Sequence, residues 1–464
     1  MTDIAIDRIS ALRAALQGDV LTPDDDGYNE ARSIWNGAID KRPALIARCA
    51  TNSDVAAAIR FARESSLEIS IRGGGHNYAG FALSDGGLTI DLTRMRSIVV
   101  DPVGRRATCG GGTTWAELDA ACQAHGLAVP GGFISHTGVA GLTLGGGLGW
   151  LTRKAGLSCD NLVGAEVVTA DGEIVRASDT DNPDLFWAIR GGGGNFGVVT
   201  SFEFRLHEVP PVVQLGLFFW GLDQGREVLT LGREFSRDLP RDLNAFIGGI
   251  YAPPEPFVPE QYRLVPGYAL IVVGFTDAET HAARIAPIRS ALPPLFELVA
   301  PIPYVALQQM FDASAPWGVL AYEKAVYLDE LSDGAISVIT EHMPRMSSPL
   351  SIVPIFALAG AYEDTADDAV AFGGRRSNRW VVNLSAGAET PEALAAEREW
   401  VRNFWTALVP HAAGVGSYVN FMAEYEEDRV RAAYGPAKYA RLSAIKAKWD
   451  PDNLFHLNAN IRPG

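Results

Sequence analysis

The sequence predicts an α+β protein in which a domain of antiparallel sheet covered by helices is inserted into a first domain. At 464 residues the chain is too long for one ordinary core, so we expect two domains or a large compound one. Segments of strand character and of helix character both recur along it. Near residue 207 the prolines of "HEVPPVV" suit a crossing between domains, and glycine-rich loops become sparse. We expect divisions at 1–206, 207–414 and 415–464, the last segment returning to the first domain.

Composition and charge are typical of a soluble globular protein. Apolar residues make up 47% of the chain and charged residues 20%. A formal net charge of −16, without a long Lys/Arg run, argues against a nucleic-acid partner. The start "MTDIAIDRIS" has no secretory pattern, and no apolar stretch reaches about 18 residues. We therefore expect a cytoplasmic protein without a membrane span.

The cysteine pattern predicts neither a zinc site nor a disulfide framework. The four cysteines, Cys49, Cys109, Cys122 and Cys159, form no C-x-x-C pair. The acidic run "DDD" at 24–26 lacks the spacing of a calcium loop, and we interpret it as a solvated loop. No metal is expected.

The first domain mixes helices and strands. "TNSDVAAAIRFARESS" (51–66) predicts a helix with a Ser, Thr or Asn cap and with Val55, Ile59 and Ala62 on one face. "AEVVTADGEIVRAS" (165–178) predicts a hairpin with Asp171-Gly172 as a two-residue turn. Further strands are predicted at 67–72, 87–93 and 195–206.

The later segments carry longer elements. "SIVPIFALAGAY" (351–362) and "RWVVNLSAGA" (379–388) predict strands, and residues 390–412 predict a helix. A final helix is expected to stop at Asp450-Pro451, because proline cannot continue it.

Glycine is clustered in runs such as "RGGGH", "GLTLGGGLG" and "RGGGGNFG". Glycine allows positive φ and lets backbone N–H groups approach a ligand, so several such loops suit an extended, phosphate-bearing cofactor; tight turns are the alternative. "GGGNFG" (192–197) matches a dinucleotide-binding pattern literally, but a helix-like segment precedes it and a strand-like one follows. That order is the reverse of a Rossmann unit, which we therefore reject.

Five ordered motifs resemble one flavoprotein family. These are "RGGGHNYAG", "HTGVAGLTLGGGLGWLTRKAGLSCDNL", "DLFWAIRGGGGNFGVVT", "YVNF" and "WDPDNLFHLNANI". They are similar to motifs of the vanillyl-alcohol-oxidase (PCMH-type FAD-binding) superfamily, in its berberine-bridge-enzyme-like branch. The resemblance covers about 40–206 and 415–464. It implies a two-part FAD-binding domain, with a core at about 40–206, and a substrate-binding domain at 207–414.

The resemblance implies that His76 bonds covalently to the flavin, behind a glycine loop that holds the FAD pyrophosphate. Some relatives add a second link from a cysteine, but Ile134 stands at that position here. We therefore expect a single link, with Cys159 packed beside the flavin. The other histidines, His136 included, are interpreted as structural. The further expected cofactor-binding residues are Arg72, Gly73, Gly74, Gly75, Asn77, Thr137, Gly138, Gly141, Gly145, Asn161, Gly197, Val199, Asn458 and Asn460.

Three residues are candidates for catalysis. Tyr418 matches the tyrosine of the family's Y-x-N motif and would act as the base; an unperturbed phenol titrates near 10, so a cation or the flavin must assist it. Aromatic packing is the alternative for that residue. Tyr78 is expected to position substrate by hydrogen bonding. Asp364 aligns loosely with the family's acidic base, with Glu363 and Asp367 as rivals and a solvated turn as the alternative.

The pocket residues bear on the substrate and the electron acceptor. Phe421 stands where many relatives carry a second tyrosine, which favours a substrate less polar than a free sugar. Thr137 matches the position that gates dioxygen in the family. The resemblance implies an FAD oxidase that acts on a small organic alcohol or secondary metabolite, uses dioxygen and forms hydrogen peroxide. The alternatives are a flavin dehydrogenase or ring-forming oxidoreductase with another acceptor, and a flavin-binding protein without turnover. The sequence leaves the oligomeric state open.

Overall fold

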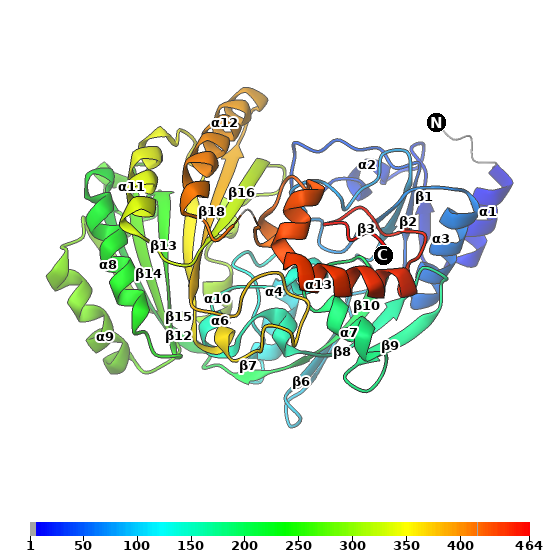
Figure 1. The fold of residues 1–464 in the computed structure, drawn as a ribbon, viewed down its shortest axis with the longest axis horizontal. Coiled ribbons are helices and arrows are strands. Elements are labelled where there is room, and N and C mark those ends of the chain that lie inside the picture. The colour runs from blue at the N-terminus through cyan, green and yellow to red at the C-terminus, as the bar shows by residue number, and fades with distance from the viewer. Residues whose placement is uncertain (1–5, 415) are drawn as a thin grey trace.

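Four sheets organise the computed structural model, which describes residues 6–414 and 416–464. They lie in two lobes side by side (Figure 1). The expected α+β fold is confirmed. In the described residues no helix is both long enough and apolar enough to cross a membrane.

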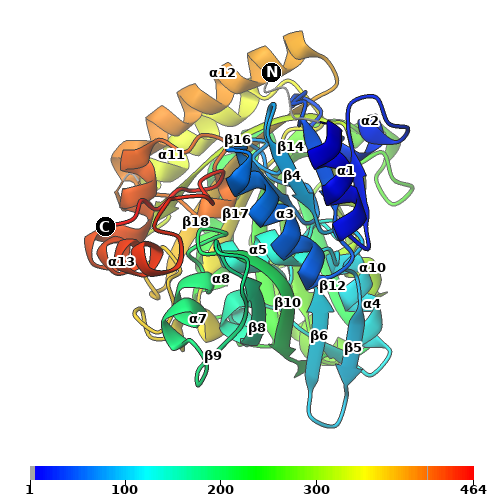
Figure 2. The same ribbon diagram turned by 90° about the vertical axis from the view of Figure 1, so that its right-hand side faces the viewer.

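The first sheet of the N-terminal lobe has the order β1-β2-β4-β3, with β4 parallel to β2 and β3. Helix α3 packs on it because Val55, Ile59 and Ala62 form a fully buried stripe, and Thr51 caps the helix by accepting from the backbone N–H of Asp54. Figure 2 shows α1 and α3 on the outer side of this lobe. The bounds are α1 Ile6–Ala15, β1 Asp19–Leu21, α2 Tyr28–Ala31, β2 Leu45–Arg48, α3 Asn52–Glu64, β3 Ile69–Arg72 and β4 Leu88–Asp91.

The second sheet is antiparallel, with the order β5-β6-β10-β8-β9. Helix α7 precedes the glycine run at 192–197 and β10 follows it. This helix-to-strand order is the reverse of a Rossmann unit, as the sequence predicts. A separate two-stranded sheet pairs β11 with β7. The bounds are β5 Ile98–Asp101, β6 Arg106–Gly110, α4 Trp115–Gln123, β7 Leu127–Ala128, α5 Val139–Gly145, α6 Thr152–Ala155, β8 Leu162–Val168, β9 Ile174–Ser178, α7 Pro183–Ile189, β10 Val198–Arg205 and β11 His207–Glu208.

The hairpin β8-β9 is present, but its turn differs from the expected one. The last pair is Val168 with Ile174, and the N–H of Gly172 donates to Thr169 O at 2.9 Å. Gly172 has φ +77°. Ala170 and Asp171 are therefore the central turn residues, and Gly172 takes the left-handed position that closes a longer loop.

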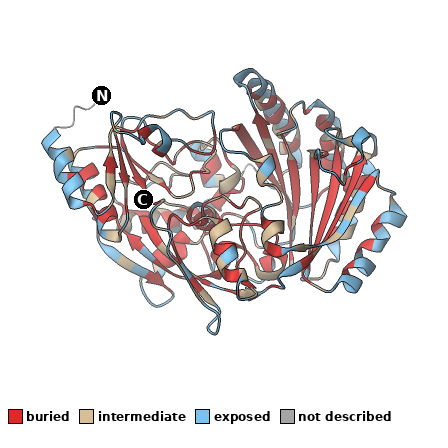
Figure 3. Ribbon diagram, turned by 180° about the vertical axis from the view of Figure 1, so that it is seen from behind, coloured by how far each residue is buried: buried red, intermediate tan, exposed pale blue. Residues whose placement is uncertain are grey.

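The third sheet forms the other lobe and is antiparallel throughout, with the order β15-β12-β14-β13-β17-β18-β16. Helices α8, α9, α11 and α12 cover one face, with their outer sides exposed (Figures 1 and 3). The other face contributes to a second core shared with the first lobe. The bounds are β12 Val212–Gly221, α8 Gly225–Arg237, β13 Leu243–Tyr251, β14 Pro266–Gly274, α9 Ala278–Ala291, β15 Phe296–Pro303, α10 Tyr304–Gln308, β16 Leu320–Leu328, α11 Asp333–His342, β17 Val353–Leu358, β18 Arg379–Ala388 and α12 Pro391–Leu408.

The C-terminal helix α13 (Glu427–Trp449) returns to the N-terminal lobe, where it lies beside α7 (Figure 1). It kinks at Gly435, whose φ is +74°, because Pro436 cannot complete the helical hydrogen bonds. It ends before Pro451, as expected. The buried ion pair between Lys446 Nζ and Asp450, 2.6 Å apart, anchors this end.

Candidate active site

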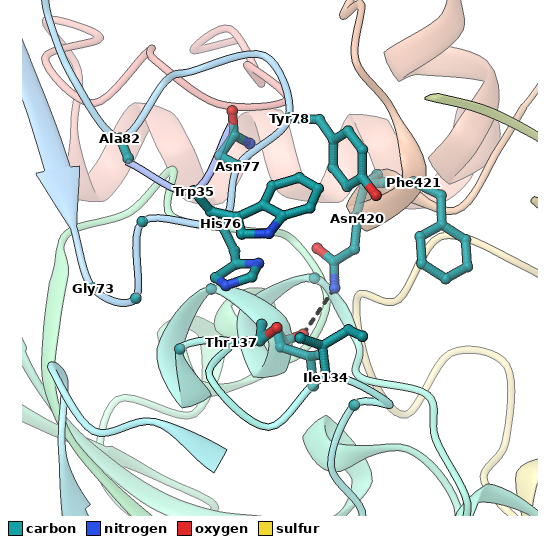
Figure 4. A pocket seen from close by; sticks show the side chains of 18 of the residues that line it. Trp35, Gly73, His76, Asn77, Tyr78, Ala82, Ile134, Thr137, Asn420 and Phe421 are labelled. Atoms are coloured by element: carbon teal, nitrogen blue, oxygen red, sulfur yellow. Dashed lines mark hydrogen bonds between the residues drawn. The ribbon is translucent and has the colours of Figure 1, made fainter. Parts of the chain in front are cut away.

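A cavity of about 400 Å³ lies between the glycine loops of the N-terminal lobe and the seven-stranded sheet. This volume falls in the usual range for small-molecule sites, about 300–1,000 Å³. Its walls come from segments far apart in the sequence, and Figure 4 shows His76, Tyr78 and Asn420 among the side chains that line it. The predicted residues that line it are Gly73, Gly74, Gly75, His76, Asn77, Tyr78, Thr137, Gly138, Gly141, Gly145, Gly197, Val199, Tyr418 and Asn458.

Two glycine loops form one wall by direct backbone contact. A Cβ on Gly74 would lie 2.2 Å from the backbone N of Gly138, and a Cβ on Gly138 would lie 2.4 Å from the N of Gly74. Gly75 has φ +71°, a conformation that favours glycine. Strand β3 therefore ends in a loop whose backbone, rather than its side chains, faces the cavity and helix α5.

His76 follows this loop and sits among aromatic rings. Trp35 stacks on it with centroids 5.0 Å apart, and Trp317 meets it edge-on at 5.8 Å. His76 Nε2 lies 2.7 Å from His136 Nδ1, a histidine that the sequence analysis took as structural. Burial, together with the neighbouring His136, lowers the pKa of His76 to about 3, so the ring is neutral at neutral pH. A neutral imidazole is the nucleophilic form.

Tyr78 reaches the sheet wall. Its hydroxyl lies 3.2 Å from Ser385 Oγ on β18, next to the buried carboxyl of Glu323 on β16. Asn383 Nδ2 donates to Glu323 Oε2 at 3.2 Å, while Glu323 Oε1 has no hydrogen-bond partner. Burial raises the pKa of Glu323 well above its usual range. The structure thus places a buried acid behind the tyrosine that faces the cavity.

Sequence reasoning missed Glu323, although a signal was present. The segment "LAYEKAVYL" places two charged residues inside an otherwise apolar strand, and "RWVVNLSAGA" places Asn383 and Ser385 at alternate positions. The register pairs Glu323 with Ser385, and alternation then brings the polar side chains to one face. A charged residue in a buried strand is itself a reason to suspect a functional site.

Tyr418 is buried at the back of the cavity. Its hydroxyl accepts from Gly147 N at 2.7 Å and from Asn420 Nδ2 at 2.8 Å. Burial raises its pKa, and neither partner is a cation. The hydrogen-bond partners of Tyr418 therefore do not supply the cation that would lower its pKa and let it act as a base. Its contacts instead connect the loop after α5 to the segment that carries Asn420.

An aromatic group forms the remaining wall. Phe133 stacks on Phe356 with centroids 4.9 Å apart, and Phe246 meets Phe311 edge-on at 5.6 Å. Phe421 meets Tyr418 edge-on at 4.8 Å. All five phenylalanines line the cavity. We call Phe133, Phe246, Phe311, Phe356 and Phe421 the aromatic wall.

Asp364 does not lie at this site. It is exposed and pairs with Arg241 in two hydrogen bonds of 2.5 and 2.7 Å, which lower the pKa of its carboxyl. It follows a 3₁₀ turn at Gly360–Glu363, beyond the end of β17. The strand predicted at 351–362 ends at Leu358, and Asp364 takes the alternative position expected for it, a solvated turn.

Four other predicted residues lie outside the cavity lining. Arg72 is buried against Ala31 O and Asp91. Cys159 is fully buried, and burial raises the pKa of its thiol. Asn161 donates to the carbonyls of Ala155 and Leu157 and so shapes a loop. Asn460 is not part of the lining, but its buried Oδ1 has no partner.

The cavity fits a phosphate-bearing flavin in two respects. First, glycines line it from three separate loops, and a Cβ on Gly141 would meet nothing within 4 Å. Second, Asn458 Oδ1 is buried without a hydrogen-bond partner although the residue lines the cavity. A buried polar atom of this kind calls for a partner, and backbone amides freed of side chains suit a diphosphate.

Two family models match the chain. An "FAD binding domain" model matches residues 43–178, and a "Berberine and berberine like" model matches residues 417–462. Both segments contribute to the cavity.

Relatives match the chain over nearly its whole length. (R)-6-hydroxynicotine oxidase of Paenarthrobacter nicotinovorans is 33% identical over 463 residues, 97% of each chain. The crystal structure of 6-hydroxy-D-nicotine oxidase from Arthrobacter nicotinovorans superposes with a TM-score of 0.86 at 29% identity, covering 97% of this chain and 98% of that one. BBE-like 1 of Physcomitrella patens shares the fold, with a TM-score of 0.87 at 21% identity over 98% and 99% of the two chains.

Proposed function

The chain belongs to the FAD-linked oxidases that carry a berberine-like C-terminal segment, and we propose that it oxidises an alcohol or secondary metabolite with FAD attached through His76. Bound FAD would take a hydride from the substrate and pass the electrons to dioxygen, which gives hydrogen peroxide. The observation that carries this proposal is that His76 and Tyr78 line the same cavity as the glycine loops and the aromatic wall.

We assign FAD binding and substrate binding to different lobes. Residues 1–206, with their core at 40–206, and 415–464 would form the FAD-binding domain, and 207–414 the substrate-binding domain. The return of α13 to the first lobe supports this division. The glycine loops and Asn458 would hold FAD, and Thr137 would gate dioxygen. Cys159, outside the lining, would make no second link.

We propose Tyr78, rather than Tyr418, as the residue that receives the substrate's hydroxyl proton. Its side chain lines the cavity, and its hydroxyl lies beside Glu323. Ionised Glu323 would accept the phenol proton as Tyr78 takes up the proton of the substrate. Asn383 would hold the carboxylate through its Nδ2, and Ser385 would fix the tyrosine ring. A general base in this position contributes about 10²–10⁴ in rate.

The aromatic wall limits the substrate. Five phenyl rings offer apolar surface and no hydrogen bonds, so a sugar's many hydroxyls would lose water there without compensation. A ring-bearing apolar molecule with one hydroxyl or amine would stack on the wall while its polar group meets Tyr78. We therefore propose an aromatic or alicyclic alcohol or amine.

The purified full-length chain tests the proposal. We expect yellow protein that stays yellow after acid precipitation, is bleached anaerobically by members of a panel of aromatic and alicyclic alcohols and amines, and forms peroxide in air. Turnover with a dye but no peroxide would replace the oxidase by a dehydrogenase. Failure of the whole panel to bleach the protein would favour a flavin-binding protein without turnover. A colourless chain that takes up no FAD would refute the assignment.

A further inference from the structure

Glu323 carries a carboxyl group that is enclosed by the protein. The residue is 0% exposed, and Asn383 Nδ2 donates to its Oε2 at 3.2 Å. Its Oε1 has no hydrogen-bond partner within the part of the chain that the structure describes. A buried oxygen of this kind calls for a proton or a donor. The neighbouring hydroxyl of Tyr78 is a group that can supply one.

Glu323, Asn383 and Ser385 form the polar set beside Tyr78, and Glu323 is the member that can take up a proton. Ser385, whose Oγ lies 3.2 Å from the Tyr78 hydroxyl, is an alcohol, and Asn383 is an amide. Neither gains a proton near neutral pH. A carboxylate does, and burial favours its neutral form. A proton that Tyr78 gives up to this set therefore goes to Glu323.

The other titratable groups around Glu323 lead no proton away from it. Lys324 follows it on β16, so strand alternation turns the lysine to the opposite face, where Nζ lies 2.7 Å from Glu424 Oε2. Tyr425 lies on the cavity side, but its hydroxyl donates to a backbone carbonyl at 3.3 Å, and a carbonyl passes no proton onward. Within the described residues, a proton that enters this carboxyl through Tyr78 must therefore leave through Tyr78.

We propose that Glu323 is a proton store that serves both halves of the reaction: it keeps the proton taken from the substrate through Tyr78 and returns it by the same route when dioxygen becomes hydrogen peroxide. This inference rests on the proposed oxidase function. It goes further because the substrate's proton stays in the protein between the two halves instead of entering the solvent.

Atoms and electrons balance for an alcohol substrate. In the first half the C–H bond breaks, and its hydrogen passes with both electrons to bound FAD as a hydride. The O–H proton goes to the Tyr78 oxygen and the Tyr78 proton goes to Glu323, so the alcohol becomes an aldehyde or ketone. In the second half dioxygen takes up the hydride's hydrogen, its two electrons and the stored proton, and leaves as hydrogen peroxide. FAD is then oxidised again, and Glu323 is again a carboxylate.

A pH-indicator dye in weak buffer tests the store in the full-length holoenzyme. The probe is the alcohol of the panel that bleaches the protein fastest, mixed without dioxygen at a pH where Glu323 is ionised. In the wild type we expect no proton to enter the medium as the flavin is reduced, and none to be taken up when dioxygen is added. Glu323→Gln should release a full proton per flavin in the first half and take one up in the second. Infrared difference spectra should show a protonated carboxyl in the reduced wild type that Glu323→Gln lacks.

Two further variants separate a store from a structural role. Glu323→Asp keeps a carboxyl and should retain the proton, and Asp364→Asn, which removes an exposed carboxyl, should match the wild type. Release of a proton by the reduced wild type would overturn the store and leave the oxidase standing, even if Glu323→Gln fails to fold. Retention of the proton by Glu323→Gln would also overturn it. If no alcohol of the panel bleaches the protein, the proposed alcohol oxidation fails and the store fails with it.

Discussion

The two walls of the cavity differ in what they present to a ligand. The glycine-loop wall presents backbone, because Gly74 and Gly138 pack so closely that neither could carry a Cβ. The opposite wall, which includes the sheet, presents side chains, namely the five phenylalanines of the aromatic wall and the polar set around Tyr78 and Glu323. A backbone surface suits a constant ligand and a side-chain surface a variable one. The comparison teaches that this fold can keep its cofactor while changing its substrate.

The largest effect on stability and FAD binding is expected from a change in the glycine-loop wall. Gly74→Ala places a Cβ 2.2 Å from a backbone nitrogen, so the two loops must separate. We expect a loss of about 3 kcal/mol in the free energy of unfolding, the upper end for overpacking, with loss of FAD uptake. Chemical denaturation and flavin absorbance measure both.

Gly141→Ala is the matched control on the same wall. Its Cβ meets no protein atom within 4 Å, and alanine suits the helix α5 better than glycine. It should unfold no more easily than the wild type yet take up FAD less well. Equal stability of the Gly74 and Gly141 variants would contradict the backbone contact.

The next effect concerns the acid on the sheet wall. Glu323 must be ionised to accept a proton, and its pKa is raised, so flavin reduction should accelerate as pH rises through a value above the usual range for glutamate. Glu323→Gln should slow anaerobic flavin reduction by about 10²-fold and remove its increase with pH. Stopped-flow absorbance across pH checks it. A slow variant whose flavin-reduction rate still rises with pH would show that another group causes this pH dependence.

A smaller effect is expected on the aromatic wall. Phe421→Tyr adds a hydroxyl to the ring that meets Tyr418, so an apolar substrate should bind about tenfold more weakly, in the lower part of the range for an imperfectly paired polar group. Steady-state KM measures this, with kcat nearly unchanged. Phe235→Tyr on α8, on the helix-covered side of the sheet, is the control. An unchanged KM would mean that Phe421 does not contact the substrate.

The smallest effect is expected outside both walls. Asp364→Asn breaks an exposed ion pair with Arg241, which contributes about 0–1 kcal/mol. Flavin reduction should stay at the wild-type rate. A fall comparable with that of Glu323→Gln would return Asp364 to the site.

The glycine-loop wall could be predicted from the sequence more completely than the opposite wall. Glycine is required wherever backbone meets backbone, so the loops around Gly74 and Gly138 form contiguous motifs. His76 and Tyr78 lie within one of those motifs and could be placed from it. The helix at 51–66 and the strand at 379–388 were readable from their periodicity, with helix ends a few residues too long.

The sheet wall could not be predicted in the same way. Its strand residues alternate between the two faces, and β18 meets β16 and β17 only through registers that no local pattern specifies. Glu323 therefore reaches Tyr78 across 245 residues of chain, counted from their positions 323 and 78. Asp364, chosen by a loose alignment, lies outside the cavity lining and beyond the end of β17 at Leu358.

The carbonyl of Ala315 has a consequence for biosynthesis. It belongs to the lobe inserted into the middle of the chain, yet it accepts a hydrogen bond from the indole of Trp35, the ring that stacks on His76. The N-terminal segment emerges first during translation but lacks this support until the inserted lobe has docked, with Gly37 N donating to Val319 O at 2.8 Å. On the proposed chemistry, a permanently coloured polypeptide is one whose two lobes have already met, so the pigment would serve as a record of completed assembly.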